Sequence, residues 1–513
     1  MLTDSFFHEN PQASLKQPKS SRSKGMRRPI SEQKRFDTTP IDEVKLNLDC
    51  RDEIIPVLRG MQQIYVDPIL RNKILDLVAE DVNRGSSKDR GREGLGYWQI
   101  LVLSSVRLGC NLDYDKLQDL AEQHRKLRQI MGFGDWDEEE TISWKRLRDN
   151  VCLLTPETIE KISHLVVEAG HQLVPDAAEK VRADSFVAET NIHYPTESTL
   201  IQDGLRKILS LSVELAISFE IPGWRQEQHL QKMIKKIVRN IGRAARSKKQ
   251  VSKEKVEELY RDLLKRAQGI LERADELVQT LENECELELA HYAQLDALKG
   301  FMGRTRIVCD TAYRRVVLGE EVPNSEKLFS IFEPHTQLYR RGKASSPMQF
   351  GRLVLLFEDS AGFVLHHHVL PRHSQDTDVA VEQARIVQKQ VDGKMKELSF
   401  DCGFHSPENQ EGLQTIIEHP CLPKKGSQQS AEQMDNASVR FRQARKRHAG
   451  VESAIGALQS GNGLKRSRDR QLIGFERYVA LGILGRNIHT LGKIAIQQED
   501  DSCEAACSYR KAA

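Results

Sequence analysis

The sequence of 513 residues has only nine cysteines, and no two of them form a CxxC pair. Cys503 and Cys507 stand close together near the C-terminal end, but no histidine accompanies them. A zinc site is therefore not expected, because such sites need clustered Cys and His ligands at short spacing. Scattered cysteines are typical of reduced thiols, so we expect free thiols of a cytosolic protein.

Long hydrophobic runs are also missing. No apolar stretch approaches the ~18 residues that a membrane-spanning helix requires. The first dozen residues, MLTDSFFHENPQ, contain no basic segment followed by an apolar one, which is the pattern of a secretory signal. We therefore expect neither a membrane span nor secretion.

A strong net charge is absent as well, since 76 Lys and Arg residues face 74 Asp and Glu residues, for a net charge of +2. The overall balance thus excludes no class of partner. Locally the charge is uneven: the segments 1–40 and 439–470 are both rich in Lys and Arg. Such clusters can contact the phosphates of nucleic acids, and they can equally be solvated surface.

The N-terminal third reads as a tail followed by a helical domain. Residues 1–40 have little apolar content, and we expect them to be disordered. Residues 41–178 contain several short amphipathic patterns with helix-start signals such as Asp67-Pro68. They resemble a helix-turn-helix-like DNA-binding domain, in which Lys145, Arg146 and Arg148 would contact DNA. An all-α packing domain with a charged outer face is the alternative, because no fixed helix-turn-helix signature is present.

A second helical region is predicted at residues 206–326. It contains a heptad seam over about four heptads, and the basic segment 229–246 is its expected partner. An insertion that packs within the chain is one interpretation, and a dimerisation or DNA-end-clamping device is the other. The seam consists of Val256, Tyr260, Leu263, Ala267, Ile270, Ala274, Leu277 and Leu281.

The hydrophobic period changes from residue 327 onward. GRLVLLFED and GFVLHHHVLP predict a β-hairpin, with a helix over 378–391 after it. A strand then ends at Asp401, a helix starts after Ser406, and PCLPKKG predicts a short edge strand. Residues 438–456 predict one basic helix that carries Glu452, residues 472–494 a buried helix, and residues 497–513 a frayed tail.

Three acids are distributed over these elements in a chemically suggestive order. Asp184 lies on the strand of VRADSFVAE, Asp401 at the end of a later strand, and Glu452 on a helix. This is the element order of an RNase H-like α/β domain, here formed by residues 179–205 and 327–496 around the helical insertion. Carboxylates are hard ligands suited to Mg²⁺ or Mn²⁺, and two such ions can support phosphoryl transfer. Three clustered acids would repel one another without bound cations.

The same stretches carry a family resemblance. The phrases RADSFVAETNIHYPTESTLIQDGLR, FDCGFHSPENQ and RHAGVESAIGALQSGNGLKRSRDR resemble those of insertion-sequence DDE transposases, in particular the group often filed as ISNCY, near the IS-five type. The resemblance extends over residues 50–495. It implies that Asp184, Asp401 and Glu452 bind two divalent metal ions and catalyse DNA cleavage and strand transfer.

The resemblance also implies partners and a location. These are transposon terminal repeats and target DNA, a dimer or higher oligomer, and a bacterial cytoplasm, close to the nucleoid. Arg445, Lys446, Arg447, Lys465, Arg466 and Arg468 would contact phosphates on either side of Glu452. The sequence departs from the family pattern before and after that acid, where His448 and Gln459 replace the usual Tyr and Lys. A DNA-binding protein without catalytic activity, a structural protein and an RNase H-like nuclease remain as alternatives.

Overall fold

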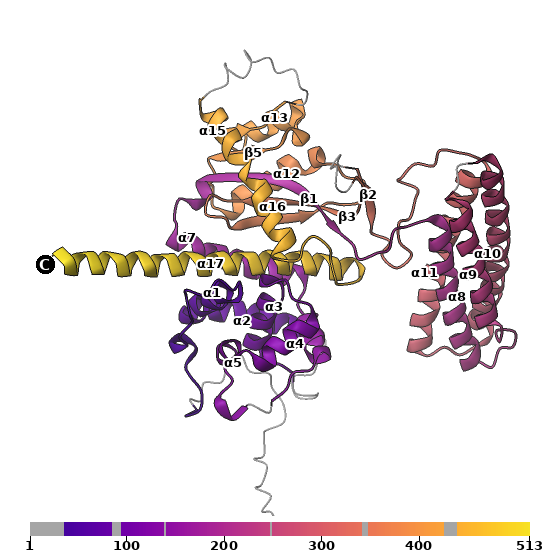
Figure 1. Ribbon diagram of the computed structural model, residues 1–513, viewed down its shortest axis with the longest axis horizontal. Coiled ribbons are helices and arrows are strands. Elements are labelled where there is room, and N and C mark those ends of the chain that lie inside the picture. The colour runs from indigo at the N-terminus through magenta and orange to yellow at the C-terminus, as the bar shows by residue number, and fades with distance from the viewer. Residues whose placement is uncertain are drawn as a thin grey trace, which may run out of the picture.

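The computed structural model describes residues 35–84, 94–137, 140–246, 249–340, 347–424 and 439–512, with side chains to residue 502. The predicted tail 1–40 therefore lies almost wholly outside the described residues. The chain is a mixed α/β protein in which N-terminal helices, a mixed sheet and a helical bundle occupy separate regions (Figure 1). Within the described ranges, no helix is both long and apolar enough to cross a membrane.

The N-terminal region consists of short helices with well-formed starts. Asp67, at the start of the second helix, accepts hydrogen bonds from the backbone N–H groups of Ile69 and Leu70. Asp113 and Thr155 act in the same way at later helices, so the start signals in the sequence have their usual physical cause. The helices are α1 (Ile54–Val66), α2 (Pro68–Asn83), α3 (Tyr97–Gly109), α4 (Tyr114–Gln123), α5 (Arg125–Ile130), α6 (Trp144–Val151) and α7 (Pro156–Leu173).

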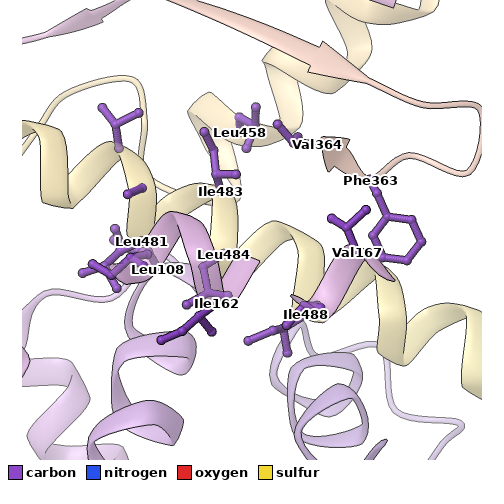
Figure 2. Close-up of a cluster of buried hydrophobic side chains, with 14 of the residues drawn as sticks. Leu108, Ile162, Val167, Phe363, Val364, Leu458, Leu481, Ile483, Leu484 and Ile488 are labelled. Atoms are coloured by element: carbon purple, nitrogen blue, oxygen red, sulfur yellow. The ribbon is translucent and has the colours of Figure 1, made fainter. Parts of the chain in front are cut away.

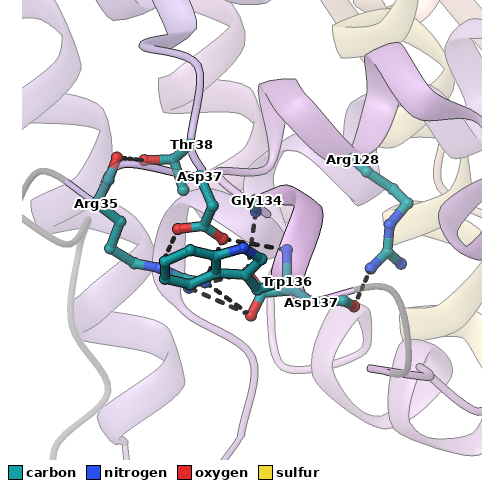
Figure 3. A network of polar contacts seen from close by, with 7 residues as sticks. All are labelled: Arg35, Asp37, Thr38, Arg128, Gly134, Trp136 and Asp137. Carbon is teal, nitrogen blue, oxygen red and sulfur yellow. Dashed lines mark hydrogen bonds and ion pairs between the residues drawn. The ribbon is translucent and has the colours of Figure 1, made fainter.

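A polar network holds the entering chain against this region (Figure 3). The guanidinium of Arg35 bridges the carboxylates of Asp37, at 2.6 Å, and Asp137, at 2.9 Å. Asp37 in turn accepts a hydrogen bond from the backbone N–H of Trp136. Arg35 and Asp37, in the segment before α1, are therefore held by contacts with a loop about a hundred residues later in the chain.

The sheet has the strand order β2-β3-β1-β5-β6, with β4 paired to β3. β3 is antiparallel to β1, β2 and β4, whereas β5 is parallel to both β1 and β6. The predicted hairpin is present as β3 and β4, and Ser406 caps α13 (Pro407–Gln414) as expected. The strands are β1 (Lys180–Glu189), β2 (Gln337–Tyr339), β3 (Gln349–Glu358), β4 (Val364–Val369), β5 (Glu397–Phe400) and β6 (His419–Cys421), and α12 (Asp376–Gln390) precedes β5.

The helical region between β1 and β2 is a bundle with a hydrophobic core of its own. It consists of α8 (Glu197–Ser218), α9 (Glu227–Ala244), α10 (Gln250–Glu284) and α11 (Leu289–Ala312). Every residue of the heptad seam on α10 is buried except Val256, which is half-buried. α10 packs against α8, α9 and α11, so the seam is used inside the chain, and α9 is among its partners as expected.

The last helix, α17 (Gln471–Ala512), lies between the sheet and the N-terminal helices (Figure 1). It packs against α1, α3 and α7, and Figure 2 shows its apolar side chains among those of α3 and α7. The prediction of a frayed tail at 497–513 is wrong, because the helix continues to Ala512. Polar residues such as Glu499 end the apolar pattern, but backbone hydrogen bonding and the ion pair of Glu499 with Arg59 extend the helix.

A buried ion pair joins the region after the predicted catalytic helix to α3. The guanidinium of Arg107 lies 2.6 Å from the carboxylate of Asp469, and their side chains are only 1% and 8% exposed. Removing one partner of such a pair leaves the other charge buried and uncompensated. We expect Asp469→Ala to lower the free energy of unfolding by about 3–5 kcal/mol, measured by denaturant unfolding. An unchanged midpoint would show that water or another group compensates Arg107.

Candidate active site

Two of the three predicted acids occupy the same position on neighbouring parallel strands. The last register pair between β1 and β5 is Ala183 with Phe400, so Asp184 and Asp401 are the next residues of the two strands. Neighbouring strands lie about 5 Å apart, which brings the two acids side by side. The Oδ1 atom of each acid accepts a hydrogen bond from the N–H of the following residue, at 2.7 Å in both cases.

On the face of the sheet that carries these acids, their nearest neighbours along β1 and β5 are polar. Because side chains alternate along a strand, Arg182 shares a face with Asp184, and Ser399 shares a face with Asp401. Arg182 donates to the Glu358 carboxylate at 2.6 Å, and burial raises the pKa of Glu358 although Arg182 opposes that shift. The opposite face is apolar, with Ala183, Phe357 and Phe400 buried there.

The third acid, Glu452, lies on a helix that is interrupted. The sequence predicted one helix over 438–456, but the structure has two, α15 (Val439–His448) and α16 (Gly450–Ser460). The single-helix prediction is therefore wrong. The interruption falls at Ala449, and the next residue, Gly450, lies close to Arg182, since a Cβ atom there would be 2.1 Å from its Nη1. Glu452 consequently lies in the first turn of α16, exposed, on a helix that packs against β1.

His448, the last residue of α15, lies beside the acids. Its Nδ1 atom is 3.2 Å from Oγ of Ser399, which places the ring on the polar face of β5. Burial lowers the pKa of His448, and the carboxylates of Asp401 and Glu452 act against that shift. Asp401, which follows β5, and Glu452, on α16, therefore both lie near enough to His448 to influence its charge.

The donor set suits a hard divalent cation. Asp184, Asp401 and Glu452 offer only carboxylate oxygens, which is the chemistry that Mg²⁺ and Mn²⁺ prefer. No group of three Asp, Glu, His or Cys side chains in the described parts of the chain is already close enough to hold one ion. The three acids fit such an ion in their chemistry, and the structure places two of them side by side and the third on a helix that packs against β1.

The basic residues predicted to contact DNA near Glu452 fall into two groups. Arg447 donates to Glu397 at 2.6 Å and Arg466 to Glu189 at 2.8 Å, so these two cations are occupied by carboxylates of the protein. Arg468 donates to the backbone oxygen of Asn111. Arg445, Lys446 and Lys465 are exposed.

The predicted DNA-contacting residues of the N-terminal region lie at the start of α6. Lys145 and Arg148 flank the exposed ring of Trp144, at 5.8 and 5.2 Å from its centre. Arg148 also pairs with Asp149 at 2.7 Å, and the guanidinium of Arg146 lies within 3.5 Å of the backbone oxygen of Gly94. The helix thus presents an aromatic ring between two cations to solvent.

Sequence reasoning missed Arg182 as a member of the site. It anchors Glu358 and also donates to the backbone oxygen of Arg447 at 3.2 Å, so it joins the sheet to the end of α15. The signal was present, because Arg182 stands two positions before Asp184 and a strand places both side chains on one face. Its partner Glu358 could not be found without the register between β1 and β3.

Comparison with known proteins gives no independent assignment. No family model, no curated protein and no solved structure matches this chain.

Proposed function

We propose that this protein is a transposase of the DDE type, which cuts DNA at insertion-sequence ends and joins the 3′ ends to target DNA. The observation that carries the proposal is the placement of Asp184 and Asp401 at matching positions of two parallel strands, with Glu452 on a helix packed against the first of them. A set of three carboxylates suits a phosphoryl-transfer site with two metal ions.

The sheet topology supports an RNase H-like fold for the catalytic domain. Three antiparallel strands, β1, β3 and β4, follow one another, and β5 and β6 are added in parallel on the other side of β1. In such a sheet the first strand and the fourth strand are neighbours, as β1 and β5 are here. The bundle α8–α11 is then an insertion between the first two strands of the core.

The roles of the chain's own residues follow from their contacts. Asp184, Asp401 and Glu452 would hold two Mg²⁺ or Mn²⁺ ions, which supply activation of the attacking oxygen and stabilisation of the leaving oxygen. Arg182 positions the end of α15 through the backbone of Arg447. His448, whose pKa is lowered by burial, contributes an imidazole ring that contacts Ser399 two residues before Asp401.

The N-terminal helices are proposed to bind the transposon ends. The support is the exposed Trp144 between Lys145 and Arg148, because aromatic and cationic side chains together suit a nucleic-acid surface. Two ends must be cut and joined together, so a dimer or larger assembly on DNA belongs to the same proposal.

The test is strand cleavage and strand transfer on DNA that carries the terminal repeats flanking the gene. We expect nicking at the repeat ends with Mg²⁺ or Mn²⁺, no reaction with EDTA, and recovery when Mg²⁺ is restored in excess. Binding to the repeats without cleavage under any metal condition would favour a DNA-binding protein that has lost catalysis. Cleavage without joined products would favour an RNase H-like nuclease.

A further inference from the structure

The bundle between β1 and β2 has one strongly basic face. α9 buries Ile234, Ile237, Val238 and Ile241 on one side, while its other side is exposed and cationic. Glu227 is the only acid in the helix, and Gln231 donates a hydrogen bond to it. The exposed cations of α9 and the turn after it are Lys232, Lys235, Lys236, Arg239, Arg243 and Arg246.

Several cations elsewhere in the bundle are neutralised by acids of the protein. On α10, Lys255, Arg261 and Arg266 pair with acids of the same helix at 2.7 to 2.9 Å. On α11, Arg306 pairs with Asp275 at 2.5 Å. None of the six α9 cations forms an ion pair with another residue that the structure describes. Unpaired like charges along one helix repel one another, and among the described residues this face has no anionic partner.

The basic face continues into a groove. α8 and α9 enclose a groove of about 290 Å³ lined by glutamines, by Ile234 and by three cations. Arg206 of α8 and Lys232 and Lys235 of α9 supply those cations. Arg206 lies 3.7 Å from Asp203, so the groove remains positive in sum.

The bundle is attached to the sheet near the predicted site. Its two connecting segments meet where β1 ends, since Oγ1 of Thr190 lies 2.8 Å from Oγ1 of Thr336. Glu197, at the start of α8, pairs with Arg315 of the short helix Tyr313–Val317. From Asp184 to the end of β1 at Glu189 is about 17 Å along the strand. DNA held at the acids would therefore pass close to the base of the bundle.

We propose that α9, together with its groove against α8, binds the phosphate backbone of the duplex that leads away from the cleavage site. From Lys232 to Arg243 the stripe is about 16 Å long, and a duplex presents one phosphate per strand about every 3.4 Å of its axis. Duplex DNA is the matching partner because its charge is regularly spaced and the proposed reaction already brings it to the sheet. This inference rests on the proposed function for its choice of anion.

The experiment compares two triple variants in the Asp401→Ala background, so that binding is measured without cleavage. Lys235→Ala, Lys236→Ala and Arg239→Ala remove charge from the α9 face. Lys255→Ala, Arg261→Ala and Arg266→Ala remove the same charge from α10, where the cations are already paired. The probe is a fluorescent end duplex about four turns, or about 40 bp, long, titrated at several salt concentrations.

We expect the α9 variant to bind at least about tenfold more weakly, with a salt slope lower by about two to three. The α10 variant should bind as the Asp401→Ala protein does, and both should keep the thermal midpoint of that protein. Equal binding by the two triple variants would overturn the inference, as would affinity for anionic phospholipid vesicles without affinity for the duplex. Cleavage that survives Asp401→Ala would instead contradict the proposed function and leave this comparison valid.

Discussion

Replacing any one of Asp184, Asp401 and Glu452 with alanine should abolish strand cleavage while DNA binding persists. The expected loss in rate is on the order of a thousandfold or more, because groups that act as one catalytic unit fail together. Binding should survive because the proposed DNA contacts lie on α6, α15 and the loop after α16, not on these acids. Cleavage of a labelled end substrate and its affinity, measured on the same preparations, give both results.

The matched control is Glu411→Ala, which removes an exposed acid of α13 in the same domain. Glu411 takes no part in the contacts of the polar face, so its variant should cleave at the unmodified rate. An acid whose alanine variant cleaves normally would be removed from the site. Loss of binding in all three variants would indicate a structural role for the acids instead.

A single methyl group at Gly492 should strongly destabilise the protein. A Cβ atom there would lie 1.8 Å from the backbone oxygen of Pro56 and 2.8 Å from the backbone nitrogen of Gly60. Backbone atoms cannot move aside as a flexible side chain can, so α17 would have to separate from α1. We expect Gly492→Ala to lower the free energy of unfolding by about 3 kcal/mol, measured by denaturant unfolding.

Gly269→Ala is the comparison for that change. Gly269 is also helical, on α10, but nothing lies within 4 Å of a Cβ atom built there. Because alanine favours a helix over glycine, this variant should be more stable by up to about 1 kcal/mol. A similar small effect at both positions would show that α1 and α17 are not in close backbone contact.

The elements that carry their own local signals could be predicted from the sequence. Ser406 and Pro407 predict the start of α13, and the turn residues after Glu358 predict the hairpin. The heptad seam predicts α10. In each case the residues that define the element lie within it. The residues of the element itself are then sufficient to predict it.

The features that depend on distant residues could not be predicted. The close approach of Gly450 to Arg182 depends on a residue of β1 more than 250 positions earlier. The pairing of Arg447 and Arg466 with Glu397 and Glu189 likewise depends on sheet register. Counting Lys and Arg in the sequence therefore gives more cations than are available to contact DNA, because some of them pair with acids of the protein.

Around the acids, too, some features have a local sequence signal and others depend on distant residues. Asp184 and Asp401 could be selected from strand patterns, but their adjacency comes from the parallel pairing of β1 with β5. The position of His448 against Ser399 is set by where α15 ends. Neither contact leaves a signature in a local stretch of sequence.

The measurement that tests the central claim most directly is the binding of Mn²⁺ to the full chain and to its Asp184→Asn variant, measured by calorimetry without DNA. We expect saturable binding of about two ions per chain, with at least one lost in the variant, because Asp184 would be one of the three carboxylates that hold them. The same Mn²⁺ stoichiometry and affinity in both proteins would contradict the assignment of these acids as a metal site.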